Sequence, residues 1–233
     1  MTLSRTQLKY IAALAMIIDH IGMFFIPITT PLGALCRIVG RLTAPIMCFF
    51  LAEGFRHTSS RKKYALRLLI FAVISQFAYS LSHYHTLLTA NMNMIFTLFI
   101  SFLVLTVYEE EKSSALKWLL IFALVAVSYI GDWGVFAPLW VLFFHIYHGN
   151  RKEQTLAFCI IAFAAVASGT VFCILNGSKW YGEIWQTGLF LAVPFLLSYN
   201  GEKGRSTTFD KWFFYVLYPT HLLLFGTIAV YVC

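Results

Sequence analysis

The chain has 233 residues, of which 60% are hydrophobic, 18% aromatic and only 12% charged. Its mean hydropathy is +0.76. A soluble domain carries about 25% charged residues, so this chain has too few charges to solvate a globular surface. The net charge of +7 does not indicate a nucleic-acid partner, because the basic residues stand between apolar runs. The composition excludes a soluble enzyme, a nucleic-acid module and a disordered chain, and it indicates an all-α integral membrane protein.

The five cysteines predict neither a disulfide framework nor a zinc site. No CxxC pair occurs; four cysteines stand inside apolar stretches, and the fifth is the last residue: Cys36, Cys48, Cys159, Cys173 and Cys233. We expect free thiols that pack as small apolar groups, and no bound metal. No cleavable signal peptide is expected, because the first apolar run carries two ionisable residues before any small-residue cleavage site.

Nine apolar segments follow one another along the chain. A transmembrane helix needs roughly 20 residues, with a range of about 17–25, and turn-rich or charged stretches separate the segments. They are 7–28, 32–55, 64–82, 93–108, 115–131, 134–148, 154–176, 184–199 and 211–232. Several are shorter than ideal, so tilt, local thinning of the bilayer or merging of 115–148 stays open. No linker or internal repeat divides the chain, and we treat residues 1–233 as one transmembrane domain.

Basic residues between these segments predict the orientation of the chain. Fourteen Lys and Arg residues fall in the loops on the side of the N-terminus, and the opposite loops hold only Lys179. Cytoplasmic loops carry the excess of Lys and Arg in membrane proteins. We therefore expect nine spans in the cytoplasmic (inner or plasma) membrane, with the N-terminus cytoplasmic and the C-terminus outside.

Polar groups within or at the ends of the predicted spans are the candidate functional residues. An ionisable side chain at the bilayer centre costs about 2.5–3.5 kcal/mol on insertion scales, so each is a functional candidate by default. These candidates come from the first two predicted spans and from later ones, and they are Asp19, His20, Arg37, Arg41, Glu53, His57, Asn93, Asp132, Tyr218 and His221.

Position along the helices brings several of these groups to one depth. At about 1.5 Å per residue, His20 lies roughly 20 Å and His221 roughly 17 Å from the cytoplasmic side, and Arg41 roughly 14 Å from the outside. Arg37 and Arg41 are four residues apart and share a helix face. We expect a polar well near the middle of the bilayer if the first, second and ninth spans pack together.

Structural roles for the same residues stay open at this point. Asp19 can form a salt bridge to Arg37 or Arg41 that only holds helices together, and His20 can be an ordinary hydrogen-bonded interior histidine. A basic cluster near the cytoplasmic end of the second span can contact anionic lipid or phosphate groups: Arg56, His57, Arg61, Lys62, Lys63 and Arg67. Four further histidines stand at span ends, where we interpret them as interfacial: His83, His85, His145 and His148.

Seven stretches of the chain resemble the TraX family of polytopic membrane proteins, in the family's order and across nearly the whole chain. They are 8–22 (LKYIAALAMIIDHIG), 36–45 (CRIVGRLTAP), 51–58 (LAEGFRHT), 63–69 (KYALRLL), 93–98 (NMIFTL), 132–134 (DWG) and 211–222 (KWFFYVLYPTHL). Each stretch is weak alone, and together they are specific. P-loop, GxGxxG, GxSxG and HExxH motifs are absent.

The resemblance implies an acetyltransferase that moves an acetyl group from acetyl-CoA to an amine. In the family archetype the acceptor is the N-terminal amine of pilin; here a peptide, an amino sugar and a small amine all stay open. The basic cluster would then hold the CoA phosphates. Direct transfer and an acyl-histidine intermediate are not distinguished.

The roles of individual residues are our own inference, made on the assumption that the chain is such an acetyltransferase. His20, with His221 as second choice, is the expected general base, because the unperturbed pKa of histidine, about 6.5, lies near working pH. Asp19 is expected to orient the base or bind the acceptor ammonium, and the two arginines to stabilise the carbonyl oxygen. We assign substrate binding to Arg37, Arg41, Glu53, Asn93, Asp132 and Tyr218.

Two other classes of function compete with this reading. The same Asp, His and Arg residues can form the proton relay of a proton-coupled transporter or exporter, although no inverted halves are evident. A purely structural role in an envelope assembly is the third. Acetyl-CoA turnover without net solute movement distinguishes the first class from the second.

Overall fold

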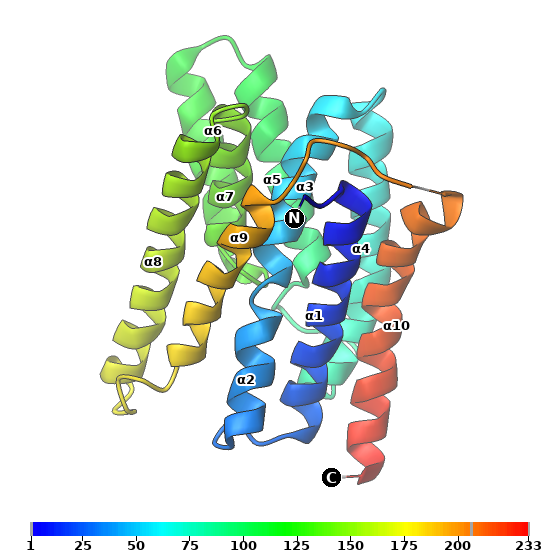
Figure 1. The fold of residues 1–233 in the computed structure, drawn as a ribbon, viewed down its shortest axis with the longest axis vertical. Coiled ribbons are helices and arrows are strands. Elements are labelled where there is room, and N and C mark those ends of the chain that lie inside the picture. Colours follow the sequence, from blue (N-terminus) through cyan, green and yellow to red (C-terminus); the bar gives the residue numbers. More distant parts are fainter. Residues whose placement is uncertain (1, 206, 233) are drawn as a thin grey trace. The chain divides into compact units, whose positions relative to one another are not determined.

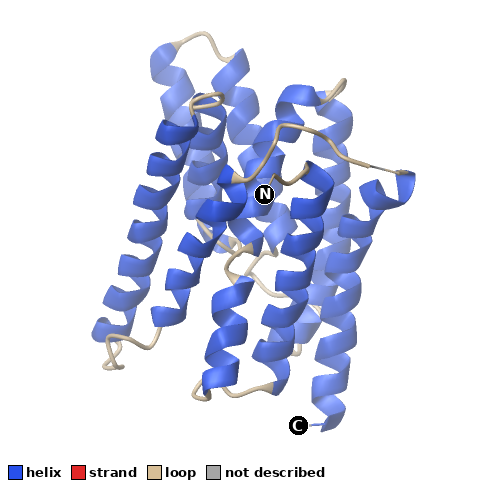
Figure 2. Ribbon diagram, in the orientation of Figure 1, coloured by secondary structure: helices blue, strands red, loops and turns tan. Residues whose placement is uncertain are grey.

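A computed structural model of the protein describes residues 2–205 and 207–232, and these are almost entirely helical (Figures 1 and 2). In chain order the helices are α1 (Arg5–Phe25), α2 (Pro31–Gly40), α3 (Thr43–His57), α4 (Arg61–Tyr84), α5 (Met94–Glu110), α6 (Ser114–Val127), η1 (Ser128–Ile130), α7 (Phe136–Ile146), α8 (Arg151–Leu175), η2 (Ile184–Leu191), α9 (Ala192–Leu197) and α10 (Thr208–Val232). The segments η1 and η2 are 3₁₀-helices.

Each of the nine predicted segments is helical in the structure. The second contains α2 and α3, the fifth α6 and η1, and the eighth η2 and α9. Among the residues that the structure describes, five helices are long and apolar enough to cross a membrane: Arg5–Phe25, Pro31–His57, Arg61–Tyr84, Arg151–Leu175 and Trp212–Ala229. Shorter apolar helices cover Ser114–Ile130, Phe136–Ile146 and Ile184–Leu197. The all-α prediction is confirmed for the described residues, and the nine-span topology stays a prediction.

The chain forms two compact units that interleave in sequence. The first comprises Met1–Met47 and Asn150–Lys211, and the second comprises Cys48–Gly149 and Trp212–Cys233. The boundary between the first two stretches falls inside α3. The single transmembrane domain stays a prediction. The four described cysteines are free thiols, as expected, and Cys233 lies outside the described residues.

The first unit is built by α1, α2, η2 and α8, with α2 packed against α1 and η2. Glycines allow this close packing: a Cβ at Gly22 would overlap Cys36, and a Cβ at Gly188 would overlap the Ile38 carbonyl. Ser4 begins α1 with a capping box, in which its side chain and that of Gln7 each bond the other's backbone N–H.

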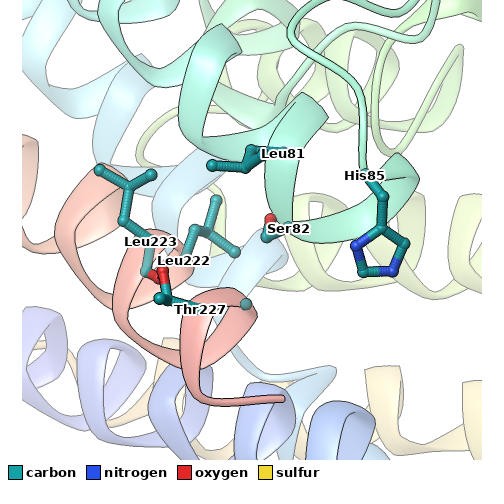
Figure 3. Close-up of a pocket in the computed structure, with 7 residues that line it drawn as sticks. Leu81, Ser82, His85, Leu222, Leu223 and Thr227 are labelled. Atoms are coloured by element: carbon teal, nitrogen blue, oxygen red, sulfur yellow. The ribbon is translucent and has the colours of Figure 1, made fainter. Parts of the chain in front are cut away.

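The second unit is centred on α5, which contacts α4, α6 and α7. Phe55, Phe102 and Trp140 are among its fully buried side chains. α10 lies beside α4, because the ring of Phe71 packs against Tyr215, with centroids 4.8 Å apart. Farther along the same helix pair, a cavity of about 180 Å³ lies between α4 and α10 (Figure 3). The predicted site residues do not line this cavity.

Candidate functional site

Asp19 joins both arginines of the predicted site in the first unit. Its Oδ1 accepts a hydrogen bond from Nη1 of Arg37 at 2.7 Å, and its Oδ2 accepts one from Nη2 of Arg41 at 2.8 Å. Arg37 lies in the last turn of α2, and Arg41 is the C-cap residue of that helix. The four-residue spacing therefore places both guanidinium groups on the face of α2 that meets α1, as the sequence predicted.

Trp185 covers the same pair of arginines from η2. The guanidinium carbons of Arg37 and Arg41 lie 4.7 and 4.6 Å from the centroid of its ring, a distance typical of cation–π contacts. The close contact of Gly188 with the backbone of Ile38 holds η2 on α2. Trp185 could not be identified from the sequence alone, because a tryptophan in an apolar segment gives no signal that distinguishes it from an interfacial one.

The cluster of Asp19, Arg37, Arg41 and Trp185 carries one formal negative and two formal positive charges. Asp19 and Arg41 are buried, with 7% and 8% of their surface exposed. In a buried ion pair the two opposite charges offset the free-energy cost of removing each of them from water. An additional positive charge keeps that cost unless an anion or a developing negative charge lies beside it. The residual positive charge therefore suits this cluster to stabilise an oxyanion.

His20 follows Asp19 on α1 and is half-buried. Its Nδ1 lies 2.8 Å from the carbonyl oxygen of Met16. A carbonyl oxygen only accepts hydrogen bonds, so Nδ1 is assigned the proton and the neutral ring carries its lone pair on Nε2. His221, a buried residue of α10 in the second unit, is held in the same way by Leu217, also at 2.8 Å. Both rings have a tautomer that suits a base acting through Nε2.

The side chain of Asn93 uses all its hydrogen-bonding positions on other residues of the second unit. Its side-chain NH₂ donates to the carbonyl oxygen of Ala72 and to Oε1 of Gln76, both at 2.8 Å. Its Oδ1 accepts from the backbone N–H of Ile95 at 2.9 Å and of Phe96 at 3.2 Å, which makes it the N-cap of α5. The amide thus uses both donors and both acceptor positions, which gives Asn93 a structural role; its role in substrate binding stays a prediction.

Tyr218 and Asp132 lie near the same end of α5. The hydroxyl of Tyr218 accepts from the backbone N–H of Met94 at 3.3 Å. The backbone carbonyl of Asp132 accepts from Oγ1 of Thr97 at 2.7 Å. Trp133 follows with a φ of 64°, a left-handed conformation that is uncommon for a residue with a side chain. The turn at 132–134 therefore keeps Trp133 in a backbone conformation that costs free energy.

Glu53 is a buried carboxylate at the end of α3, where two histidines approach it. Its Oε1 lies 3.1 Å from Nε2 of His148, and its Oε2 lies 3.8 Å from Nε2 of His57. A second pair joins His145 to Glu109 at 2.7 Å, and this hydrogen bond lowers the pKa of the Glu109 carboxyl. His145 and His148 have the sequence positions of interfacial residues, and their carboxylate partners, 36 and 95 positions away, give no local signal.

The members of the predicted basic cluster differ in their contacts and in their exposure. Arg61 pairs with Glu110 at 3.3 Å, and Arg67 donates to the hydroxyl of Tyr215 at 3.2 Å. The remaining four side chains are exposed: Arg56, His57, Lys62 and Lys63. Within residues 2–205 and 207–232, no group of three or more His, Cys, Asp or Glu side chains has the arrangement that holds a metal ion.

Comparison with known proteins gives the family of the chain. The TraX protein family model matches residues 4–229. The chain is 35% identical over 231 residues to a probable fimbrial assembly protein FimC, serogroup H1, of Dichelobacter nodosus, which covers 95% of this chain and 93% of the relative. It is 36% identical over 85 residues to an uncharacterized protein of Rickettsia prowazekii (strain Madrid E), which covers 36% of this chain and 30% of that relative. No solved structure matches. The chain belongs to the TraX family.

Proposed function

We propose that this protein is a membrane-embedded N-acetyltransferase that moves an acetyl group from acetyl-CoA to an amine. The observation that carries the proposal is the buried cluster of Asp19, Arg37 and Arg41, whose formal charges leave one positive charge in excess. Nucleophilic attack on the acetyl carbonyl carbon, in the thioester or in an acyl-enzyme intermediate, places negative charge on the carbonyl oxygen. A fixed pair of guanidinium groups in a poorly solvated place lowers the energy of that state.

Proton transfer is assigned to His20, with His221 as the second choice. The acceptor arrives mainly as an ammonium ion, and it must lose a proton before its nitrogen can attack. The Nδ1 bond to Met16 fixes the ring of His20 and puts the lone pair on Nε2, so that this atom accepts the proton. Asp19 precedes His20 on α1 and is bound by both arginines. These two ion pairs fix the position of α1 and therefore of the base that it carries.

The donor is assigned to the basic cluster of the second unit. Arg56, Lys62 and Lys63 are exposed, so their charged groups can reach the phosphates of acetyl-CoA. Glu53, Asp132 and Tyr218 remain proposed substrate contacts, and Asn93 supports them through the start of α5. No metal is needed for this chemistry.

The acceptor follows from the relatives. The TraX family is associated with acetylation of pilin, and a homologue across nearly the whole chain is named a probable fimbrial assembly protein. We propose the N-terminal amine of a pilin-like peptide as the acceptor class. We further propose nine spans in the cytoplasmic membrane, with a cytoplasmic N-terminus, so that the basic cluster faces the cytoplasmic pool of acetyl-CoA.

The test uses the purified full chain in lipid nanodiscs with radiolabelled acetyl-CoA. One peptide has a free N-terminus, and a matched peptide has the same sequence with a blocked N-terminus and no lysine. We expect label on the first peptide only, and loss of transfer in His20→Ala. His83→Ala is the matched control, because Nδ1 of His83 also lies near the carbonyl oxygen four residues earlier, at 3.3 Å from Tyr79. Equal activity of the two variants would remove His20 from the mechanism.

A further inference from the structure

Two histidine–carboxylate pairs in the second unit are built in opposite ways. In the pair of His145 and Glu109, the histidine side chain is 5% exposed and the carboxylate side chain is 39% exposed. In the pair of His148 and Glu53, the histidine is 39% exposed and the carboxylate is 9% exposed. The partner that solvent and substrates can reach is therefore the carboxylate in the first pair and the imidazole in the second.

The first pair has the character of a structural clamp. The ring of His145 is enclosed by aromatic side chains, with the centroids of Phe55 and Tyr108 at 5.6 and 6.0 Å in edge-to-face arrangements. Its buried Nδ1 has no hydrogen-bond partner. A ring in this setting cannot meet a substrate, so its bond to Glu109 serves to join α7 to α5.

The second pair has the arrangement of an activated nucleophile or base. A buried carboxylate close to one ring nitrogen of a histidine stabilises the positive charge that forms when the other ring nitrogen reacts. Oε1 of Glu53 lies 3.1 Å from Nε2 of His148 in an ion-pair contact. When the ring is neutral with its proton on Nε2, Nδ1 carries the lone pair. The negative charge of Glu53 also stabilises any positive charge that forms on this ring.

The surroundings of the second pair point to the acetyl donor. His57 stands one turn beyond Glu53 on α3, with its Nε2 3.8 Å from the carboxylate. Arg56, its neighbour in sequence, is exposed and acts electrostatically on both Glu109 and His145. The proposed CoA-binding cluster thus begins at the helix end that carries Glu53.

We propose that Nδ1 of His148 accepts the acetyl group of acetyl-CoA, with Glu53 as the positioning residue that stabilises the acetylated ring. This inference rests on the proposed function. The lone pair of Nδ1 attacks the thioester carbonyl carbon, the C–N bond forms, and the C–S bond breaks. The CoA thiolate leaves and takes a proton from solvent. The ring is then an acetyl-imidazolium with its proton on Nε2, the nitrogen that lies beside the Glu53 carboxylate.

The second half of the reaction regenerates the ring. The acceptor, in its free-amine form, attacks the acetyl carbon, the amide C–N bond forms, and the bond to Nδ1 breaks. The departing Nδ1 takes the proton that the amine nitrogen loses, and the ring passes it to solvent. Without an amine, water replaces the acceptor, and slow release of acetate follows.

The test mixes the full chain in nanodiscs with acetyl-CoA and no amine, and quantifies released CoA by chromatography after rapid quenching. Thiol reagents are unsuitable because the chain has five cysteines. We expect a burst of CoA stoichiometric with the protein, followed by slow hydrolysis. His148→Asn is expected to lose the burst, and Glu53→Gln to slow it by roughly 100-fold or more.

His145→Asn and Glu109→Gln are the matched controls, since they remove the same chemical groups from the clamp. Both are expected to keep the burst amplitude, and monodisperse elution shows which variants are folded. A burst that persists in folded His148→Asn, or amine acetylation by the wild type without any burst, overturns this inference and leaves the proposed function intact. Absence of both acetyl-CoA binding and amine acetylation in the wild type overturns the proposed function as well.

Discussion

The side chain of Asp19 lies directly against the Cα of Gly40, so that a methyl group at this position would occupy the space of the carboxylate. Gly40 is the last residue of α2 and is itself buried. Its lack of a side chain is what allows α1 and α2 to approach until one carboxylate reaches both Arg37 and Arg41. The geometry of the charged cluster therefore depends on a residue that carries no charge.

Gly40→Ala is expected to damage both stability and activity. Overpacking of a filled interior costs about 1–3 kcal/mol, and the added methyl group must displace the carboxylate. Thermal unfolding in detergent and acetyl transfer in nanodiscs measure the two effects. Gly169→Ala on α8 is the control, because its Cβ would lie 3.2 Å from the nearest atom, the Cβ of Glu183. Equal effects of the two substitutions would contradict the importance of the Gly40 contact.

Because the cluster has an excess positive charge, substitutions of its acidic and basic members are expected to have unequal effects on stability and activity. Asp19→Asn leaves the buried guanidinium group of Arg41 and the half-buried one of Arg37 without a counter-charge, and it is expected to cost about 3–5 kcal/mol. Arg37→Gln leaves the pair of Asp19 and Arg41 intact, so the fold is expected to survive. Its kcat is expected to fall roughly 100- to 1,000-fold if Arg37 stabilises the oxyanion. Full activity in a folded Arg37→Gln variant would support the alternative in which these charges only hold helices together.

Asn93→Ala is expected to be strongly destabilising for a structural reason. It removes the N-cap of α5 and the side-chain donor to the carbonyl oxygen of Ala72, and it leaves Oε1 of Gln76 with only the backbone N–H of residue 93. The expected loss in the free energy of unfolding is about 2 kcal/mol or more. Asn176→Ala, at the exposed end of α8, is the control and is expected to change stability by less than about 0.5 kcal/mol. Similar midpoints of unfolding for the two variants would argue against this role.

Asp210 predicts a pH dependence at the start of α10. The hydroxyl of Tyr10, with further hydrogen bonds from the backbone N–H and hydroxyl of Thr207, lowers the pKa of this exposed carboxyl to about 2. A lowered pKa means that the contact stabilises the fold above the ordinary value near 3.9 and is lost as the pH falls toward 2. The stability difference between wild type and Asp210→Asn, measured by thermal unfolding, is expected to be constant from pH 7 to 5, to shrink as the pH falls toward 2, and to vanish only below pH 2. A pH-independent difference would contradict the assignment.

Local patterns in the sequence account for the helices and for part of the cluster. Apolar runs bounded by turn residues predicted every helical segment, because the length of an apolar run and its breaks are local properties. The spacing of Arg37 and Arg41 placed them on one face, and both contact Asp19. The sequence did not predict that one carboxylate engages both arginines, since that depends on the glycine contact between α1 and α2.

Contacts between distant segments could not be predicted from one sequence. Trp185 meets the two arginines across about 145 residues, and His148 meets Glu53 across 95. Neither residue stands in a motif whose chemistry is evident locally. The hydrogen bonds that Asn93 makes in the structure were likewise not evident from the sequence, because a polar residue at the start of a span does not reveal whether its amide is already saturated.

The most direct test of the account is acetyl transfer by the purified protein, with wild type and His20→Ala compared under identical conditions. The account predicts that the wild type transfers label from acetyl-CoA to the N-terminal amine of a pilin-like peptide, and that folded His20→Ala loses at least about 100-fold in rate. Absence of acetyl-CoA binding and turnover in a folded wild-type protein would contradict the account and favour a transport role for the buried charges.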